Sequence, residues 1–183
     1  MRARSFTMVE MVIVIVIIGI LTIMAFPRID VFRLLKFQGA GKKILSDIRY
    51  AQSVAVLNHL YTGIQFLPNS ALPGSNVYSV YFCNNTPCIP VTAANWPPMI
   101  DPLSRANMAV NYANDPQFKG ISINSAAFGS SNMLVFNTDG APVDAVSNVV
   151  LTGNGSVVLN YSGETISVSV AAKSGKVYVS KSF

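Results

Sequence analysis

The hydrophobic pattern of the chain begins with a long apolar run. Residues 6–26 are apolar throughout except for Glu10 and the hydroxyl groups of Thr7 and Thr22. A helix rises about 1.5 Å per residue, so this run makes a helix about 30 Å long, enough to cross the hydrocarbon core of a bilayer. The pattern therefore predicts a membrane-spanning helix over Phe6–Phe26.

A second pattern, from about Arg28 to about Leu57, has the period of a helix with one apolar face. Small and apolar residues recur there at alternating spacings of four and three: Phe37, Gly41, Ile44, Ile48, Ala51 and Ala55. Polar residues share another face: Lys42, Ser46, Arg49 and Ser53. The pattern predicts a half-buried helix. Because Pro27 lacks a backbone donor, we expect the helix to bend at that residue.

From Tyr61 onward, short β-branched or aromatic runs alternate with turn residues, which is typical of strands. The predicted strands are Thr62–Leu67, Val77–Phe82, Gly120–Asn124, Met133–Asn137, Val149–Thr152, Ser156–Asn160, Thr165–Val170 and Lys176–Ser180. Glycine-containing links at 153–155, 162–163 and 174–175 predict that the last four strands form a meander. The segment from Cys83 to Phe118 is rich in Pro and Asn and predicts a long surface excursion.

The predicted fold class is α+β, a long N-terminal helix packed against an antiparallel β-sandwich head. The net charge of +5 comes from the helical part, because residues 50–183 hold five basic and five acidic residues. The high pI therefore gives no indication of a nucleic-acid-binding surface on the head. Arg2 and Arg4 precede the apolar run, which predicts that this end stays in the cytoplasm and that the remainder is exported.

Glu10 is the exception within the apolar run. A charged side chain inside a membrane helix costs about 2.5 to 3.5 kcal/mol and normally has a partner. A secretory signal peptide would place its small cleavage-site residues after the apolar core, whereas Ser5 lies before it. An ordinary signal anchor with an incidental glutamate remains an alternative.

Ser5-Phe6-Thr7-Met8-Val9-Glu10 resembles the class III signal of type IV pilins and type II secretion pseudopilins, and Pro27 stands where pilins often carry a helix-bending proline. The resemblance implies that a prepilin peptidase cleaves between Ser5 and Phe6 and methylates the Phe6 amine. That amine would then pair with Glu10 of a neighbouring subunit, with Thr7 in the same assembly motif. The family usually has Gly before the cut, so Ser5 predicts slower processing.

Residues 43–56, 134–142, 165–169 and 174–179 are similar to the GspH/FimT group of minor pseudopilins and minor pilins. The group implies four segments: a leader at 1–5, a membrane helix and filament core at 6–26, a stem helix at 27–59 and a β-rich head at 60–183. It also implies an inner-membrane protein with a periplasmic head that later lies near the tip of a pilus or pseudopilus. The implied partners are other pilins, the prepilin peptidase and an inner-membrane assembly platform.

Cys83 and Cys88 enclose a short loop in what we expect to be an oxidising compartment, which predicts a disulfide. Two cysteines without a nearby histidine cannot complete a zinc site. Asn137-Thr-Asp139-Gly140, followed by Asp144, resembles part of a calcium loop but lacks further acidic ligands, so a plain turn is the favoured interpretation.

Catalysis and cofactor binding have little support, because the single histidine, His59, lies at the junction of helix and sheet with no triad pattern nearby. We expect no enzyme activity and no cofactor. Two alternatives stay open: an anchored enzyme or small-ligand binder, and a DNA-binding minor pilin of an uptake pilus. The DNA-binding hypothesis rests on a basic and aromatic tail: Lys173, Lys176, Tyr178, Lys181 and Phe183.

Overall fold

A computed structural model describes residues 7–25, 28–67, 76–83, 87–89, 91, 96–102 and 104–182. The chain divides into two compact units, Met1–Lys36 and Phe37–Phe183. The boundary between them falls inside the second helix. The four segments expected from the sequence therefore stay a prediction.

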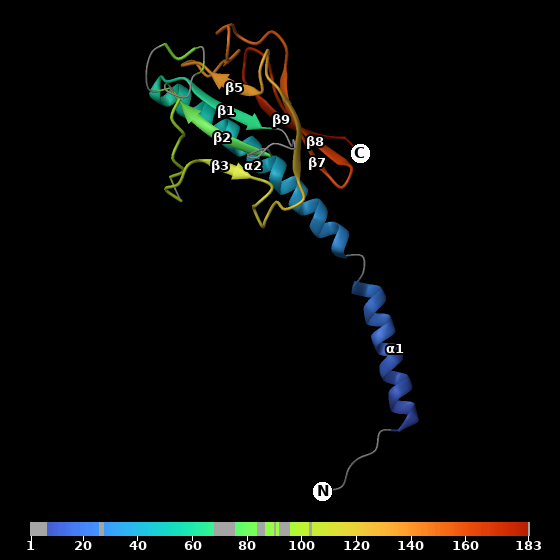
Figure 1. Cartoon of the computed structure of the whole chain (residues 1–183). Coiled ribbons are helices and arrows are strands. Elements are labelled where there is room, and N and C mark those ends of the chain that lie inside the picture. Colours follow the sequence, from blue (N-terminus) through green and yellow to red (C-terminus); the bar gives the residue numbers. More distant parts are fainter. Residues whose placement is uncertain are drawn as a thin grey trace. The chain divides into compact units, whose positions relative to one another are not determined.

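The first unit contains α1 (Met8–Ala25) and the beginning of α2 (Arg28–Asn58) (Figure 1). Phe6, Phe26 and Pro27 lie outside the described residues, so neither the ends of the predicted membrane run nor the predicted bend is tested. Within the part of the chain that the structure describes, no helix is both long enough and apolar enough to cross a membrane.

The apolar face predicted for α2 is confirmed. All six of its predicted positions are buried, and Ala40 is buried beside them. The four residues of the predicted polar face are exposed: Lys42, Ser46, Arg49 and Ser53. The helix ends at His59, whose φ of 51° is left-handed, and the Leu60 N–H donates to the Ala55 carbonyl at 3.1 Å. This arrangement is a Schellman cap, so His59 caps the end of the helix.

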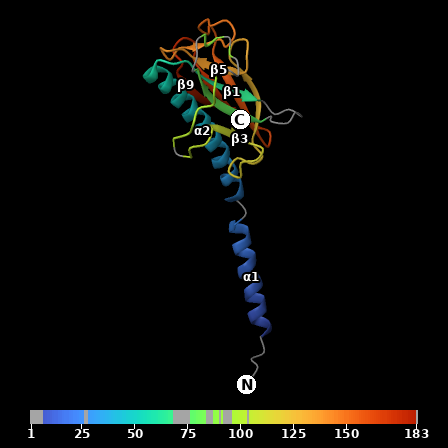
Figure 2. The same ribbon diagram turned by 60° about the vertical axis from the view of Figure 1, so that its left-hand side comes forward.

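One antiparallel sheet has the strand order β3-β2-β1-β5-β6. Its strands are β1 (Thr62–Leu67), β2 (Val77–Phe82), β3 (Ala109–Asn111), β5 (Met133–Phe136) and β6 (Pro142–Val143). The bounds of β1 and β2 are those predicted. Figures 1 and 2 both show α2 lying alongside β1 and β2, and in Figure 1 it passes behind them.

The other antiparallel sheet has the order β4-β7-β8-β9. Its strands are β4 (Ser122–Ala127), β7 (Gly155–Tyr161), β8 (Glu164–Val170) and β9 (Val177–Ser182). Ser162 and Gly163 join β7 to β8 with φ angles of 52° and 89°, the two positive values that a type I′ hairpin turn requires. The hairpin predicted at Ser174-Gly175 joins β8 to β9.

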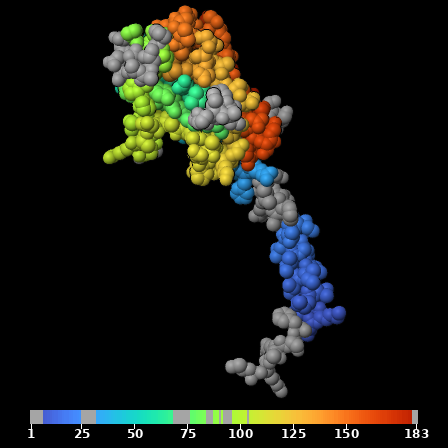
Figure 3. All heavy atoms as spheres, in the orientation of Figure 1, coloured from blue at the N-terminus to red at the C-terminus, as the bar shows by residue number. Residues whose placement is uncertain are grey.

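Both sheets and α2 contribute to one core. Its members include Ile44 and Ile48 of α2, Phe66 of the five-stranded sheet, and Val157 and Val168 of the four-stranded sheet. Segments far apart in the sequence, green, yellow and orange in Figure 3, accordingly lie against one another in the second unit. The predicted α+β fold is therefore confirmed.

Three predictions about the head are wrong. Val149–Thr152 is no strand, since only Val150 forms a bridge, with Val143 of β6 in the five-stranded sheet. The meander therefore has three strands, and residues 153–154 lie in the link that leads from the five-stranded sheet to β7. The strand predicted at 120–124 begins later, because Gly120 has a φ of 93° and the Ile121 N–H closes a turn onto the Phe118 carbonyl.

The third wrong prediction is the surface excursion between Cys83 and Phe118. This segment contains β3, and Trp96, Met99 and Tyr112 within it are buried. Gly63 makes room for Trp96, because a Cβ at that position would lie 2.8 Å from the indole ring. The segment therefore forms part of the packed head.

Candidate assembly site at the N-terminal helix

Thr7 begins α1 as its N-cap residue. Its side-chain Oγ1 accepts from the Glu10 N–H at 3.3 Å, and its carbonyl accepts from the N–H groups of Glu10 and Met11. Thr7 and Glu10 have the spacing of a capping box, with glutamate at the third helical position. A carboxylate in the first turn also interacts favourably with the helix dipole, which stabilises the helix by about 0.3 to 1 kcal/mol. Sequence reasoning that considered only assembly missed this local role, although the Thr-x-x-Glu pattern indicates it.

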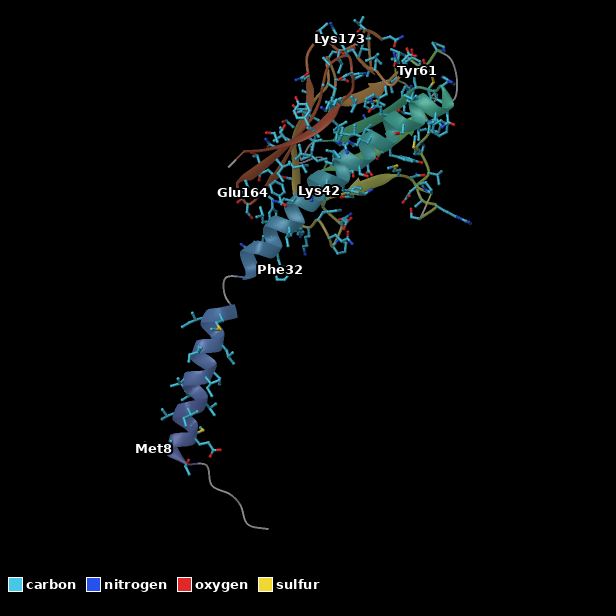
Figure 4. All side chains as sticks on the ribbon, turned by 180° about the vertical axis from the view of Figure 1, so that it is seen from behind. Met8, Phe32, Lys42, Tyr61, Glu164 and Lys173 are labelled. Atoms are coloured by element: carbon cyan, nitrogen blue, oxygen red, sulfur yellow. A yellow bond between two sulfur atoms is a disulfide. The ribbon has the colours of Figure 1, made fainter. Side chains whose placement is uncertain are left out.

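The side chains of α1 are apolar on every side of the helix (Figure 4). Their exposed fractions run from 42% for Val14 to 88% for Met8. The hydroxyl of Thr22 donates to the Ile18 carbonyl at 2.7 Å, so it is satisfied within the helix. A helix that is apolar all round is found buried, in lipid or among other protein elements.

Glu10 is the one ionisable side chain of α1, and it is exposed. Within the described residues, no ion pair to Glu10 is present. If α1 is surrounded by apolar material, the Glu10 carboxylate needs a positive group from elsewhere. The Phe6 amine and Ser5 lie outside the described residues, so the structure leaves that pairing and the cleavage site as predictions.

The other site residues named from the sequence lie in the head. Lys173 and Lys176 are exposed on the β8–β9 hairpin, and the side chain of Lys181 lies outside the described part of the chain. Figure 4 places Lys173 at the end of the sheet opposite to Glu164. The structure therefore brings two of these three lysines together on one turn.

The predicted disulfide between Cys83 and Cys88 is present. It follows β2 directly, and the carbonyl of Cys88 accepts from Trp96 Nε1 at 2.7 Å. The disulfide loop is thereby joined to the buried indole of Trp96, which packs with Met133 and Val135 in a second apolar cluster.

Residues 137–141 form the plain turn favoured by the sequence, in which the Gly140 N–H donates to the Asn137 carbonyl at 2.9 Å. Asp144 lies elsewhere and joins its own loop to the link between β4 and β5: its carboxylate accepts from Ser130 of that link, and from Ser147 and the Val146 N–H of its own loop. The hydrogen bonds from Ser130 hold the pKa of Asp144 well below its usual range. Among the described residues, no group of three or more potential metal ligands of the His, Cys, Asp or Glu type is present.

A buried charged network in the head was missed by the sequence analysis. Asp47 of α2 is 4% exposed, and its carboxylate accepts from Tyr78 Oη at 2.6 Å and from Lys43 Nζ at 2.7 Å. The hydroxyl of Tyr112 is buried and has no hydrogen-bond partner among the described residues. Burial, with the nearby Asp47 charge, raises the pKa of both tyrosines. The position of Asp47 beside the apolar face of the helix is the only sequence signal for this network.

Comparison with known proteins bears on both units. Residues 1–26 match the prokaryotic N-terminal methylation motif. The minor pseudopilin EpsH from the type 2 secretion system of Vibrio cholerae is similar in structure, with a TM-score of 0.51 over 80% of this chain and 97% of EpsH, at 8% sequence identity. The chain therefore combines a prokaryotic N-terminal methylation motif with a fold similar to that of EpsH.

The minor pilin FimU of Pseudomonas aeruginosa is also similar to this chain, at 15% identity. In one crystal form the TM-score is 0.47, over 78% of this chain and 91% of FimU. In a second form it is 0.45, over 79% of this chain and 87% of FimU. The fold assignment rests on EpsH alone. A search of curated protein sequences finds no match to this chain.

Proposed function

We propose that this pilin-like chain is a minor structural subunit that helps to initiate or cap a type IV pilus or a type II secretion pseudopilus. The proposal is supported by the methylation motif at residues 1–26 and by the likeness of the fold to a minor pseudopilin. In this proposal the chain has no catalytic role, and its head lies in the periplasm before assembly.

The observation that carries the proposal is the chemistry of α1. The helix is apolar on all sides and exposes every large apolar side chain, yet it has a single carboxylate in its first turn. In a purely lipid-facing anchor, the cost of the unpaired Glu10 charge exceeds its gain from the helix dipole, whereas a helix that moves from lipid into a bundle of similar helices can pair the charge. The full run Phe6–Phe26 holds the chain in the membrane until then.

The assembly step follows from charge. A prepilin peptidase cleaves between Ser5 and Phe6 and methylates the new amine. That amine, in a neighbouring subunit, lies opposite Glu10 and neutralises it within hydrocarbon, where an unpaired charge is most costly. The pair fixes the axial position at which one subunit docks against the next, and the assembly platform and the other pilins complete the filament.

The test is a comparison of two variants of α1. Glu10→Gln keeps the size of the side chain and removes its charge, and Thr22→Val removes a polar group that is satisfied inside the same helix. In a deletion strain of the host at matched expression, both variants should insert and be cleaved, and only Glu10→Gln should lose piliation or secretion. Wild-type assembly by Glu10→Gln, or equal loss by both variants, would contradict a docking role for the charge.

A further inference from the structure

The outer face of the five-stranded sheet, opposite α2, carries a cavity of about 550 Å³. This is the face turned toward the viewer in Figure 1, where α2 passes behind the strands. Its floor is a row of directly paired residues across four strands: Met133 of β5, Gln65 of β1, Ser79 of β2 and Ala109 of β3. Neighbouring strands lie about 4.8 Å apart, so the row is about 14 Å long, the length of about four extended residues.

One side of the cavity is walled by Trp96, Pro97 and Pro98. The wall is fixed to the edge of β2, because the Phe82 N–H donates to the Pro97 carbonyl and the Met99 N–H donates to the Val80 carbonyl. The space over Gly63 is filled by the Trp96 ring, whose N–H is already donated to Cys88. The wall is therefore rigid and apolar, and its indole N–H is not available to a ligand.

Four neutral polar side chains face the same cavity: Gln65, Ser79, Tyr81 and Asn107. Within the described part of the chain, none of them makes a side-chain hydrogen bond. Amide and hydroxyl groups offer both donors and acceptors, which is what a peptide backbone requires at each residue. The cavity thus combines an apolar wall with unused neutral hydrogen-bonding groups, as ligand sites do.

Among the residues that the structure describes, the lining carries no charged side chain. This neutrality extends along the chain, because no Asp, Glu, Lys or Arg occurs between Arg49 and Asp101. A charged ligand would lose its hydration here without gaining a counter-charge. Trp96 is 3% exposed, so its ring offers no open face for stacking on a sugar, and Pro97, Pro98 and Met133 suit aliphatic side chains.

We propose that this cavity binds an uncharged, extended peptide segment with proline or aliphatic side chains, supplied by another protein. The segment lies along the row from Met133 to Ala109, with its side chains against the Trp96-Pro-Pro wall and its amides paired with Gln65 and Asn107. Extended proline-rich segments fit such a site because they lose little conformational entropy on binding. The proposal is independent of filament assembly.

The test uses Trp96, the single tryptophan of the chain, as the reporter. The full-length chain in detergent is titrated with acetyl-Ala-Pro-Pro-Ala-amide, and tryptophan fluorescence and the indole N–H resonance are followed. We expect a saturable change with half-saturation below about 5 mM. The same titration with acetyl-Glu-Pro-Pro-Glu-amide and with maltose should give no saturable change.

Two variants make the test specific. Gln65→Glu replaces an amide donor by a charge in the cavity, and should weaken peptide binding at least about tenfold. Gln117→Glu makes the same change on an exposed loop and should bind as wild type. Thermal unfolding checks that both variants are folded. Absence of saturable peptide binding, equal binding of maltose, or unchanged affinity in a folded Gln65→Glu chain would overturn the proposal.

Discussion

The two tyrosines beside Asp47 should respond in opposite directions to the same substitution. Their ring centroids lie 5.9 Å apart in the core, and both hydroxyls are buried. Tyr78→Phe removes a hydrogen bond of 2.6 Å to the Asp47 carboxylate and leaves a buried acceptor unpaired, which should cost about 2 to 3 kcal/mol of unfolding free energy. Tyr112→Phe removes a hydroxyl that has no partner among the described residues, so it should stabilise the fold by about 1 kcal/mol.

The assay is urea unfolding of each variant, followed by near-ultraviolet circular dichroism of the head. With a slope of about 2 kcal/mol per molar urea, the midpoint should fall by about 1 to 1.5 M in Tyr78→Phe and rise by about 0.5 M in Tyr112→Phe. A double variant should show whether the two effects add. Equal destabilisation by both substitutions would refute the assignment of the Tyr112 hydroxyl as an unsatisfied group.

Three further predictions concern the head. Burial raises the pKa of Tyr78 and Tyr112, so their neutral forms stabilise the fold fully below about pH 10. The unfolding free energy, measured against pH, should therefore fall as the pH rises above that value. A flat profile up to about pH 11 would contradict this prediction. Replacing both Cys83 and Cys88 by Ser should lower the unfolding free energy by about 2 kcal/mol, the entropy of closing a loop of about six residues, and reductant should lower it equally in the wild type and have no effect in the variant. The full-length chain should bind duplex DNA no more tightly than about 10 µM at physiological salt; tighter binding that is lost in Lys173→Ala/Lys176→Ala and falls steeply with salt would favour the DNA-uptake alternative.

The parts of the fold that follow from local periodicity could be predicted from the sequence. The buried face of α2 and the bounds of β1 and β2 can be predicted from the spacing of apolar residues alone. The turn at Ser162-Gly163 can be predicted from the tolerance of glycine for positive φ angles. Val149–Thr152 has the composition of a strand, but only Val150 forms a bridge, with Val143 of β6. The turn before it is held by the Asp144 carboxylate, which accepts from the Val146 and Ser147 N–H groups and also from Ser130, 14 residues away in the chain. Local composition does not report such a tertiary contact.

The functional and buried polar residues, too, could be predicted from the sequence only in part. The apolar run and Glu10 are visible in the sequence, because their signal is local. The packing of Trp96 over Gly63 is not, since it depends on which segment returns to the outer face of the sheet. The same holds for Asp47, whose partner Tyr78 is 31 residues away along the chain.

The most direct test of the account is the intact mass of the mature chain, purified from membranes of cells with an active prepilin peptidase. The mass should correspond to a chain that begins at Phe6 and carries one added methyl group, and fragmentation should place that methyl on the Phe6 amine. A parallel sample from cells without the peptidase should retain Met1–Ser5 and lack the methyl group. A chain that keeps Met1–Ser5 in cells with the active peptidase, or that is cleaved at another residue, would contradict the proposal that this protein is a pilin-like assembly subunit.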